Sequence, residues 1–288
     1  APGGVAHGSR RTPTTVIGAY VALTKPRIIE LLLITTVPTM ILAASGWPST
    51  WLVVVTLIGG TLSAGSANAV NMYVDRDIDA LMERTQARPL VTGVIEPRSA
   101  LIFALSLQAV AFGVLWSGAN LLSAVLAFAA AAFYIGVYTI WLKRTSRQNI
   151  VIGGAAGALP PVIGWAAVTG SVGVPALLLF AIVFYWTPPH FWALAIKYKD
   201  DYAAAGIPML HVVAPIAKVE QQMWFHTIAM FATSYLTLYS AALPAWSYIA
   251  NTALTIFFAI QMFSLKSSQI EKSAAKIFHG SITYLSLY

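Results

Sequence analysis

Three oxygen-bearing side chains, Asn71, Asp75 and Asp79, recur every four residues where a long apolar run ends. In a helix this spacing places them on one face. Carboxylates so close together repel each other unless a cation neutralises them, and Mg²⁺ shared between carboxylates and a substrate's phosphates is a common solution. The pattern therefore predicts a magnesium site, whereas a solvated helix end would be the alternative interpretation.

Two arginines, Arg84 and Arg88, follow at the same four-residue spacing. Guanidinium groups bind phosphate oxygens through paired hydrogen bonds. Arginines that only fix membrane topology and touch lipid headgroups would look the same in isolation. Beside an acidic stripe, however, groups for a cation next to groups for an anion favour a diphosphate site.

The composition indicates a polytopic membrane protein, because 58% of the 288 residues are hydrophobic and only 9% are charged. Uncharged runs long enough to cross a membrane are expected to form helices, since backbone groups in lipid need hydrogen bonds within their own segment. A ninth run begins at Ile277 and is too short to cross a core of roughly 30 Å, so we expect the chain to end inside its last helix. Eight complete spans are predicted near 27–46, 51–71, 99–117, 120–142, 150–168, 174–196, 223–243 and 246–265.

All seventeen lysines and arginines fall before or at the start of the first span or after an even-numbered span. By the positive-inside rule the N-terminus and these loops face the cytoplasm, or the matrix in an organellar protein. The tryptophans at 47, 51, 116 and 246 lie at the opposite ends of the spans, as an aromatic belt would. Topology and anionic lipid account for the net charge of +7, so it is not an indication of nucleic-acid binding.

The chain contains no cysteine, which excludes disulfides and thiolate metal sites. Residues 1–26 are predicted to form a cytoplasmic tail with an interfacial helix, because no cleavage site precedes Lys25. Residues 27–288 then form one transmembrane domain of two pseudo-repeated four-helix halves and a final helix. The long polar loops 72–98 and 197–222 each follow the second helix of a half, so both are expected over one cavity.

Three blocks of the sequence carry a family resemblance. The block Asn71-x3-Asp75-x3-Asp79 with Arg84 and Arg88-Pro89-Leu90 resembles the first signature of the intramembrane prenyltransferase superfamily. Residues 143–165, from Lys143-Arg144-Thr145 to Gly164-Trp165, and residues 188–210, from Pro188-Pro189-His190 to Met209-Leu210, resemble its heme O synthase branch. The similarity runs from about Leu23 to the C-terminus.

The resemblance implies an all-α bundle of nine transmembrane helices around a central cavity, in the bacterial cytoplasmic membrane. Members of that branch transfer a farnesyl group from farnesyl diphosphate to the 2-vinyl group of heme B, with addition of water, and release heme O and diphosphate. Mg²⁺ is the implied cofactor. The resemblance also leaves room for a protein partner such as heme A synthase or a terminal-oxidase assembly protein.

The resemblance also implies roles for individual residues. Relatives that prenylate phenols have a second Asp-x3-Asp motif, whereas Lys197 stands here in place of its first aspartate and Asp201 is retained. This departure favours heme as the acceptor. The implied metal ligands are Asn71, Asp75, Asp79 and Asp201, with Lys197 as a further catalytic residue; the diphosphate contacts are Arg84, Arg88, Lys143, Arg144 and Lys199; the heme contacts are His190 and Trp165.

Several alternatives remain open at the level of sequence. A prenyltransferase for a phenolic or chlorin acceptor would share the first motif. A transporter that moves cations along the acidic stripe is disfavoured, because no charge lies deep in any span. His190 is either an axial heme ligand or a histidine satisfied inside the bundle, and His211 is expected to be solvated. The Pro188-Pro189 pair is expected to break the sixth span.

Overall fold

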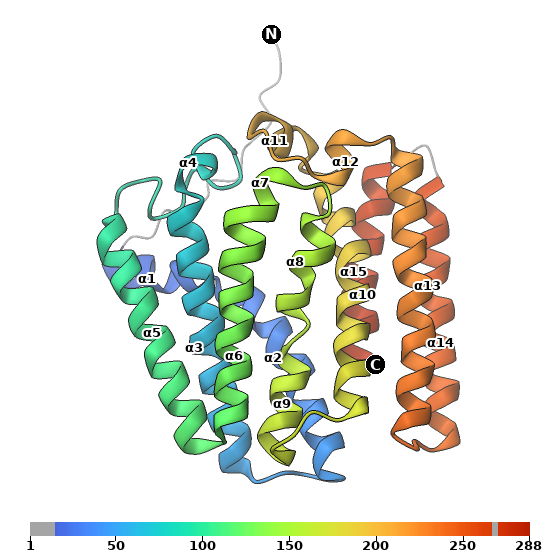
Figure 1. The fold of residues 1–288 in the computed structure, drawn as a ribbon. Coiled ribbons are helices and arrows are strands. Elements are labelled where there is room, and N and C mark those ends of the chain that lie inside the picture. The colour runs from blue at the N-terminus through green and yellow to red at the C-terminus, as the bar shows by residue number, and fades with distance from the viewer. Residues whose placement is uncertain (1–14, 267–269) are drawn as a thin grey trace.

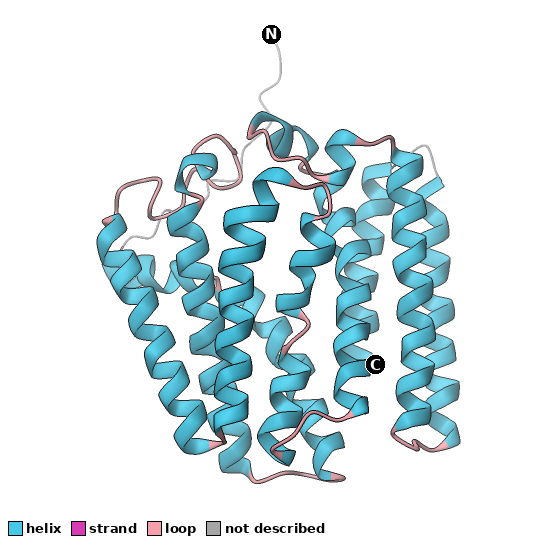
Figure 2. Ribbon diagram, viewed as in Figure 1, coloured by secondary structure: helices cyan, strands magenta, loops and turns pink. Residues whose placement is uncertain are grey.

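The structure, a computed structural model, describes residues 15–266 and 270–288, apart from the side chains of residues 27–33 and 266. Most of the predicted N-terminal tail, including Arg10 and Arg11, lies outside these residues. Within the described ranges all regular secondary structure is helical (Figure 1, Figure 2). The all-α prediction is therefore confirmed.

Long helices form the bundle and short helices lie at one of its ends, where α4, α7, α11 and α12 gather in Figure 1. The long elements are α2 (Pro26–Ala44), α3 (Thr50–Val74), α5 (Pro97–Gly118), α6 (Leu121–Phe133) continued by the π-helix η1 (Tyr134–Leu142), α8 (Asn149–Gly157) followed by α9 (Pro160–Thr169), α10 (Val174–Ile196), α13 (Ile216–Ser240), α14 (Ala245–Phe263) and α15 (Ile270–Leu287). The short ones are α1 (Val16–Thr24), α4 (Arg76–Asp79), α7 (Lys143–Thr145), α11 (Lys199–Ala204), α12 (Leu210–Val213) and the 3₁₀ turn η2 (Ser264–Lys266).

Local sequence signals account for many helix starts. Proline occupies the first helical position of α2, α5 and α9, where its missing N–H costs no hydrogen bond. Asn120 precedes α6 and its side chain accepts a 2.9 Å hydrogen bond from the Ser123 amide. Gly170 ends α9 in the left-handed region, with φ of 66°.

Six helical segments of the described chain are long and apolar enough to cross a membrane. They are Thr50–Val74, Pro97–Gly118, Leu121–Thr145, Asn149–Thr169, Val174–Ile196 and Ala245–Phe263. Each matches a predicted span closely at both ends. The chain is therefore an integral membrane protein of the helical class.

Three sequence expectations were wrong in detail. The seventh helix begins at Ile216 and the last at Ile270, each seven residues earlier than predicted. Polar residues such as Lys218 and Glu271 fill these first turns, and they lower hydropathy without preventing a helix. The fifth predicted span is interrupted between α8 and α9, where Pro160 and Pro161 supply no backbone donors.

The proline pair inside α10 does not break that helix, contrary to expectation. Helix α10 continues through Pro188 and Pro189 to Ile196. The Thr187 hydroxyl, next to the proline pair, donates a 2.8 Å hydrogen bond to the Val183 carbonyl one turn earlier.

The buried apolar side chains form one large cluster and several smaller ones. The largest cluster of buried apolar side chains joins α8, α10, α13, α14 and α15 and reaches Ile78 and Met82 beside α4. Smaller clusters join α1, α3 and α5, and others include Met40 of α2 and Ile163 of α9. Helix α8 contributes to the largest cluster, whereas α9 packs on α2, so the interrupted helix connects the largest cluster to α2. The division into four-helix halves stays a prediction.

Candidate functional site

The predicted stripe is present at the end of the bundle where the short helices gather. Helix α3 ends at Val74 and Asp75 lies between α3 and α4, but the Asp75 amide still donates to the Asn71 carbonyl at 2.9 Å and the Asp79 amide to the Asp75 carbonyl at 2.8 Å. The helical register is thus kept across the junction. Asn71, Asp75 and Asp79 are all buried, with exposures of 3%, 0% and 2%.

A cation pairs with each of the two buried carboxylates, one from the start of α7 and one from the loop after α4. Lys143, at the start of α7, donates to Asp75 Oδ2 in a short contact. Arg88 donates to Asp79 Oδ2 at 2.5 Å. A buried charge is stable only when it is paired, and here each carboxylate has one cation against it. Both ion pairs join residues that were predicted to belong to the site.

The amide of Asn71 is held on both sides. Its Nδ2 donates to Asp75 Oδ2 at 2.7 Å and to Thr139 Oγ1 at 3.1 Å. Its Oδ1 accepts a 2.6 Å hydrogen bond from Lys25 Nζ. The sequence does not indicate a site role for Lys25 or Thr139. Lys25 is explained there by membrane topology alone, and Thr139 lies in an uncharged run.

Arg144 lies at the rim of the site. Its guanidinium donates to both carboxylate oxygens of Asp77 at 2.7 Å, and it is 3.8 Å from Asp75 Oδ1. The side-chain hydrogen bond from Arg144 lowers the pKa of Asp77 to about 2. Arg144 was predicted to bind diphosphate, but in the structure it is engaged by an exposed carboxylate.

A cavity of about 650 Å³ extends from this cluster into the bundle. Its polar end is lined by Lys25, Asn71, Asp79, Arg84, Arg88 and Lys143, and its deeper walls come mainly from α2, α3, α6, α8, α9, α10 and α15. Small and apolar side chains dominate those deeper walls. A charged end joined to an apolar interior suits an amphiphile with an anionic head and a hydrocarbon tail.

Two tyrosine pairs line the cavity near its polar end. Tyr134 and Tyr138 stack with ring centroids 5.2 Å apart on η1. Tyr198 and Tyr202 come from the loop before α11 and from α11 itself. None of the four was selected from the sequence, because an aromatic residue in a bundle is more often a packing residue.

Residues 197–202, where some relatives have a second Asp-x3-Asp motif, contribute tyrosines to the cavity rather than charges. Lys197 and Lys199 are exposed and neither lines the cavity. Asp201 Oδ2 instead accepts a 3.3 Å hydrogen bond from the Arg84 backbone amide, which ties α11 to the loop after α4. Arg84 itself lies 5.4 Å from the Tyr198 ring centroid. The predicted roles of Lys197, Lys199 and Asp201 therefore gain no support from their positions.

His190 lies in the cavity wall between two aromatic rings. Its imidazole stacks on Trp186 at 4.1 Å and on Phe278 at 4.6 Å between ring centroids. Its Nδ1 is 2.7 Å from Ser281 Oγ, and that hydroxyl donates to the Phe278 carbonyl. Because the serine proton is committed, the imidazole donates through Nδ1–H and its Nε2 carries the lone pair.

Trp165 and His211 are placed differently from the predictions. Trp165 packs beside Gly173, in the loop between α9 and α10, and is not among the cavity-lining residues. Its predicted heme contact therefore has no support in the geometry. His211 is buried in α12 rather than solvated, and burial lowers its pKa to about 4.

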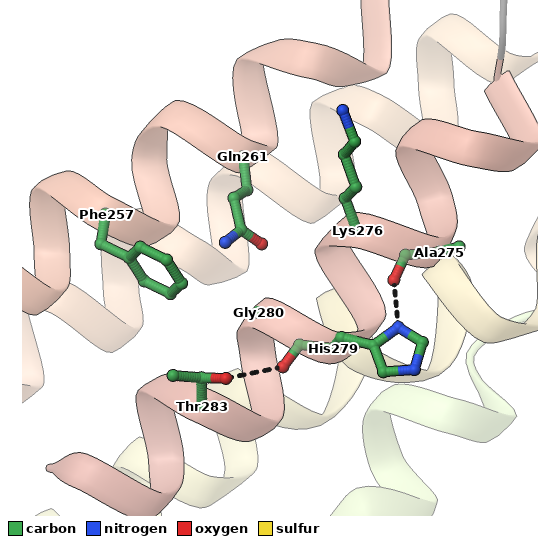
Figure 3. Close-up of a pocket in the computed structure, with 7 residues that line it drawn as sticks. All are labelled: Phe257, Gln261, Ala275, Lys276, His279, Gly280 and Thr283. Atoms are coloured by element: carbon green, nitrogen blue, oxygen red, sulfur yellow. Dashed lines mark hydrogen bonds between the residues drawn. The ribbon is translucent and has the colours of Figure 1, made fainter.

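A second hollow, of about 410 Å³, lies between α14 and α15 (Figure 3). In the close-up the His279 Nδ1–H donates to the Ala275 carbonyl of its own helix at 2.7 Å. Lys276 is the one charged side chain among the lining residues drawn there. A single lysine with no carboxylate cannot organise a metal diphosphate, so the cavity described above is the candidate site.

The cavity's donor set fits a hard cation. Asn71 and the two aspartates offer oxygen atoms, which Mg²⁺ prefers. Asp75 Oδ1 is buried without a hydrogen-bond partner and has only the more distant ion pair with Arg144, at 3.8 Å. Among the described residues no three His, Cys, Asp or Glu side chains converge as a complete metal cage, so a bound metal would need further ligands from its substrate.

Comparison with solved structures places this fold among known membrane proteins. The UbiA homolog from Aeropyrum pernix K1, in its apo form, superposes with a TM-score of 0.72 at 18% identity, covering 90% of this chain and 95% of that one. The UbiA homolog from Archaeoglobus fulgidus bound to GPP and Mg²⁺ gives 0.66 at 17% identity, covering 93% and 98%. At these identities the similarity concerns the fold.

Comparison of sequences gives much closer relatives. The protoheme IX farnesyltransferase 1 of Saccharopolyspora erythraea is 53% identical over 276 residues, which cover 94% of this chain and 88% of that protein. The protoheme IX farnesyltransferase of Frankia alni is 51% identical over 282 residues, covering 94% and 95%. Residues 32–282 match the UbiA prenyltransferase family. The chain therefore belongs to the UbiA prenyltransferase family.

Proposed function

We propose that the protein is a protoheme IX farnesyltransferase, which transfers the farnesyl group of farnesyl diphosphate to the 2-vinyl group of heme B. Water is added in the same reaction, and the products are heme O and diphosphate. The observation that carries this proposal is the cavity with Asp79 and several cations at one end, next to the buried pair of Asp75 and Lys143, and with apolar walls beyond. Relatives that are about half identical over nearly the whole chain are named protoheme IX farnesyltransferase.

The polar end of the cavity would bind the diphosphate. Asn71, Asp75 and Asp79 supply oxygen ligands for Mg²⁺, which when bound neutralises the leaving diphosphate and so favours cleavage of the allylic C–O bond. Arg88 and Lys143 already lie against those carboxylates. With those carboxylates engaged by a bound cation, Arg88 and Lys143 would donate to phosphate oxygens instead.

The hydrocarbon part of the reaction takes place deeper in the cavity. Cleavage leaves an allylic cation, and the vinyl π electrons of heme form the new C–C bond to it. The resulting cation beside the porphyrin is captured by water, which loses a proton and leaves the hydroxyl group. Stacked Tyr134 and Tyr138 lie next to the polar end, where aromatic faces stabilise positive charge.

His190 is the residue we propose for the heme iron. Its Nδ1–H is satisfied by Ser281, so Nε2 is the nitrogen with a free lone pair in the cavity wall. An imidazole whose second nitrogen is fixed by a hydrogen bond is the usual form of a metal ligand. Trp186 and Phe278 hold the ring from both faces and would keep that lone pair in one direction.

The membrane arrangement belongs to the same proposal. We propose that α2, α13 and α15 join the six apolar segments in a nine-helix transmembrane bundle, and that the short helices face the cytoplasm. Lys143, Arg144 and Lys199 lie at that end, which supports this orientation by the positive-inside rule. A heme A synthase or a terminal-oxidase assembly protein would then meet the product at this membrane.

Mass spectrometry of the porphyrin tests the reaction. Purified protein is incubated with heme B, farnesyl diphosphate and Mg²⁺, beside a sample treated with chelator and a sample offered a phenolic acceptor. We expect the heme to gain one farnesyl group and one water only when Mg²⁺ is present. Prenylation of the phenol without any change in heme would instead establish the alternative acceptor class.

A further inference from the structure

Lys25 joins α1 to α2 in an unusual backbone conformation. Its φ and ψ are 51° and 61°, in the left-handed region, which costs a residue with a side chain roughly 1–2 kcal/mol. The following Pro26 disfavours the right-handed helical conformation at this position. The Asn68 side chain fixes the same junction by donating a 2.9 Å hydrogen bond to the Thr24 carbonyl. Strain that is held in place by its surroundings often marks a functional position.

This conformation allows the Lys25 side chain to enter the cavity. Its Nζ is 2.6 Å from Asn71 Oδ1, and it lines the same cavity as Asp79, Arg88 and Lys143. A lysine that served only the membrane topology would extend its ammonium to water or to lipid headgroups. Lys25 instead adds a cation beside the proposed diphosphate site.

The hydrogen bonds of Asn71 determine what Lys25 can do there. Both donor positions of the amide are used, by Asp75 and by Thr139. Thr139 is fixed in turn, because its hydroxyl donates to the Tyr134 carbonyl at 3.0 Å. Oδ1 is therefore the side-chain atom of Asn71 that could bind a metal, and Lys25 donates a hydrogen bond to that oxygen.

We propose that Lys25 is a diphosphate-binding residue that holds the Asn71 oxygen in the ligand-free protein and moves to a phosphate oxygen when metal and prenyl diphosphate bind. The inference rests on the proposed function. An ammonium and a magnesium ion repel each other, so they do not share one amide oxygen at close range. The released ammonium is on a flexible four-carbon stem, and phosphate oxygens bound to the same metal would lie beside it.

A purely structural role for Lys25 would predict something different. If Lys25 only tied α2 to α3, its loss would loosen the site and weaken the binding of every ligand. If Lys25 competes with the metal and assists the diphosphate, its loss has opposite effects on the two ligands. The sign of each change therefore separates the two roles.

Binding measurements without turnover give both signs. Mn²⁺ replaces Mg²⁺ as the metal probe and is followed by electron paramagnetic resonance, while the thiolo analogue of farnesyl diphosphate is titrated calorimetrically in saturating Mg²⁺. The variants are Lys25→Met, Lys25→Arg and Arg76→Gln. Arg76 is a matched control, because it is exposed at the same end of the bundle and does not line the cavity.

We expect Lys25→Met to raise the Kd of the analogue about tenfold, which corresponds to about 1.4 kcal/mol, and to lower the Kd of Mn²⁺ measured alone. Lys25→Arg should keep most of the analogue affinity, and Arg76→Gln should change neither value more than about twofold. Equal weakening of both ligands in Lys25→Met, or an unchanged Kd for the analogue, would overturn the inference. If the unsubstituted protein bound no analogue at all, the proposed function would fail as well.

Discussion

Each buried carboxylate of the site is paired with a cation, one distant in sequence and one nine residues further along the chain. Asp75 is paired with Lys143 and Asp79 with Arg88. A preformed pairing of this kind keeps the charges stable inside the bundle before any ligand arrives. If a metal diphosphate binds here as proposed, its metal would take the carboxylates as ligands and its phosphates would accept hydrogen bonds from the two cations.

His190 gives a prediction that can be read from the heme spectrum. We expect His190→Ala to shift the Soret band of bound heme, because the proposed axial ligand is lost. Ser281→Ala should give a smaller shift, since the imidazole stays but its Nδ1 partner is removed. Absorption spectra of the purified variants check both. The control is His279→Gln, at the separate hollow of Figure 3, and identical spectra for all the proteins would return His190 to a structural role.

Asp77 gives a prediction about pH. Its pKa is lowered from 3.8 to about 2 in the folded protein, chiefly by the hydrogen bond from Arg144. A carboxyl with a depressed pKa stabilises the fold above its ordinary pKa, and this contribution disappears as pH falls through the folded value. Asp77→Asn should therefore lower the thermal midpoint slightly at pH 5 to 8, by the equivalent of about 0.2–1 kcal/mol for an exposed pair.

Thermal melts of Asp77→Asn and the unsubstituted protein from pH 8 downward test this expectation. The difference between their midpoints should shrink below about pH 4 and vanish near pH 2. Asp200→Asn is the control, because Asp200 is also exposed and has no ion pair within the described part of the chain. A difference that grew on acidification would contradict the assigned direction.

Sequence patterns were sufficient to predict that five side chains lie together at one end of the bundle, namely Asn71, Asp75, Asp79, Arg88 and Lys143. Their spacing and their position at the ends of apolar runs carry that information. The same patterns could not predict in which direction a side chain points. Lys197 and Lys199 share that end but face outward, whereas Lys25, counted as a topological charge, faces the cavity.

At the scale of elements, the π-helix and the broken helix shape the cavity wall. A π-helical turn adds a residue to the normal turn and often marks a functional site. Here η1 directs Thr139 to Asn71 and is followed by Lys143, which contacts Asp75. Hydropathy located the surrounding span correctly, but it does not distinguish a π-helix from an α-helix, so this feature could not be predicted.

Gly153 of α8 tests the importance of that wall. A Cβ at Gly153 would lie 2.3 Å from Tyr138 Cδ2, so Gly153→Ala must displace the ring that stacks on Tyr134. We expect a loss of stability of about 1–3 kcal/mol and slower farnesyl transfer, measured by thermal melts and by product formation. Gly113→Ala is the matched control, since nothing lies within 4 Å of its added methyl group. Equal behaviour of the two variants would show that the wall is not constrained there.

At the scale of the whole molecule, charge and hydropathy together describe most of the architecture. Six of the predicted spans coincide with long apolar helices. The late predicted starts of the seventh and last helices have one cause, because a helix can begin before its hydrophobic part begins. Helices α13 and α15 begin in polar sequence near Lys218 and Glu271 and continue into the apolar region.

The orientation of the bundle is testable because the chain has no cysteine. Single cysteines are introduced as Arg147→Cys, before α8, and as Ser171→Cys, between α9 and α10, both at exposed positions. With a membrane-impermeant thiol reagent on spheroplasts, Ser171→Cys should react from outside and Arg147→Cys only after permeabilisation. The reverse pattern would place the short helices on the outer face.

The most direct test of the account compares heme O formation by Asp75→Asn and Asp77→Asn. These aspartates are two residues apart, but Asp75 is buried beside Asn71 and Lys143 whereas Asp77 is exposed. We expect Asp75→Asn to lose transfer at least a hundredfold, a barrier increase of about 2.7 kcal/mol, while it still binds heme. Asp77→Asn should stay within about twofold of the unsubstituted protein. Equal activity of the two variants would contradict the placement of the metal diphosphate at Asn71, Asp75 and Asp79.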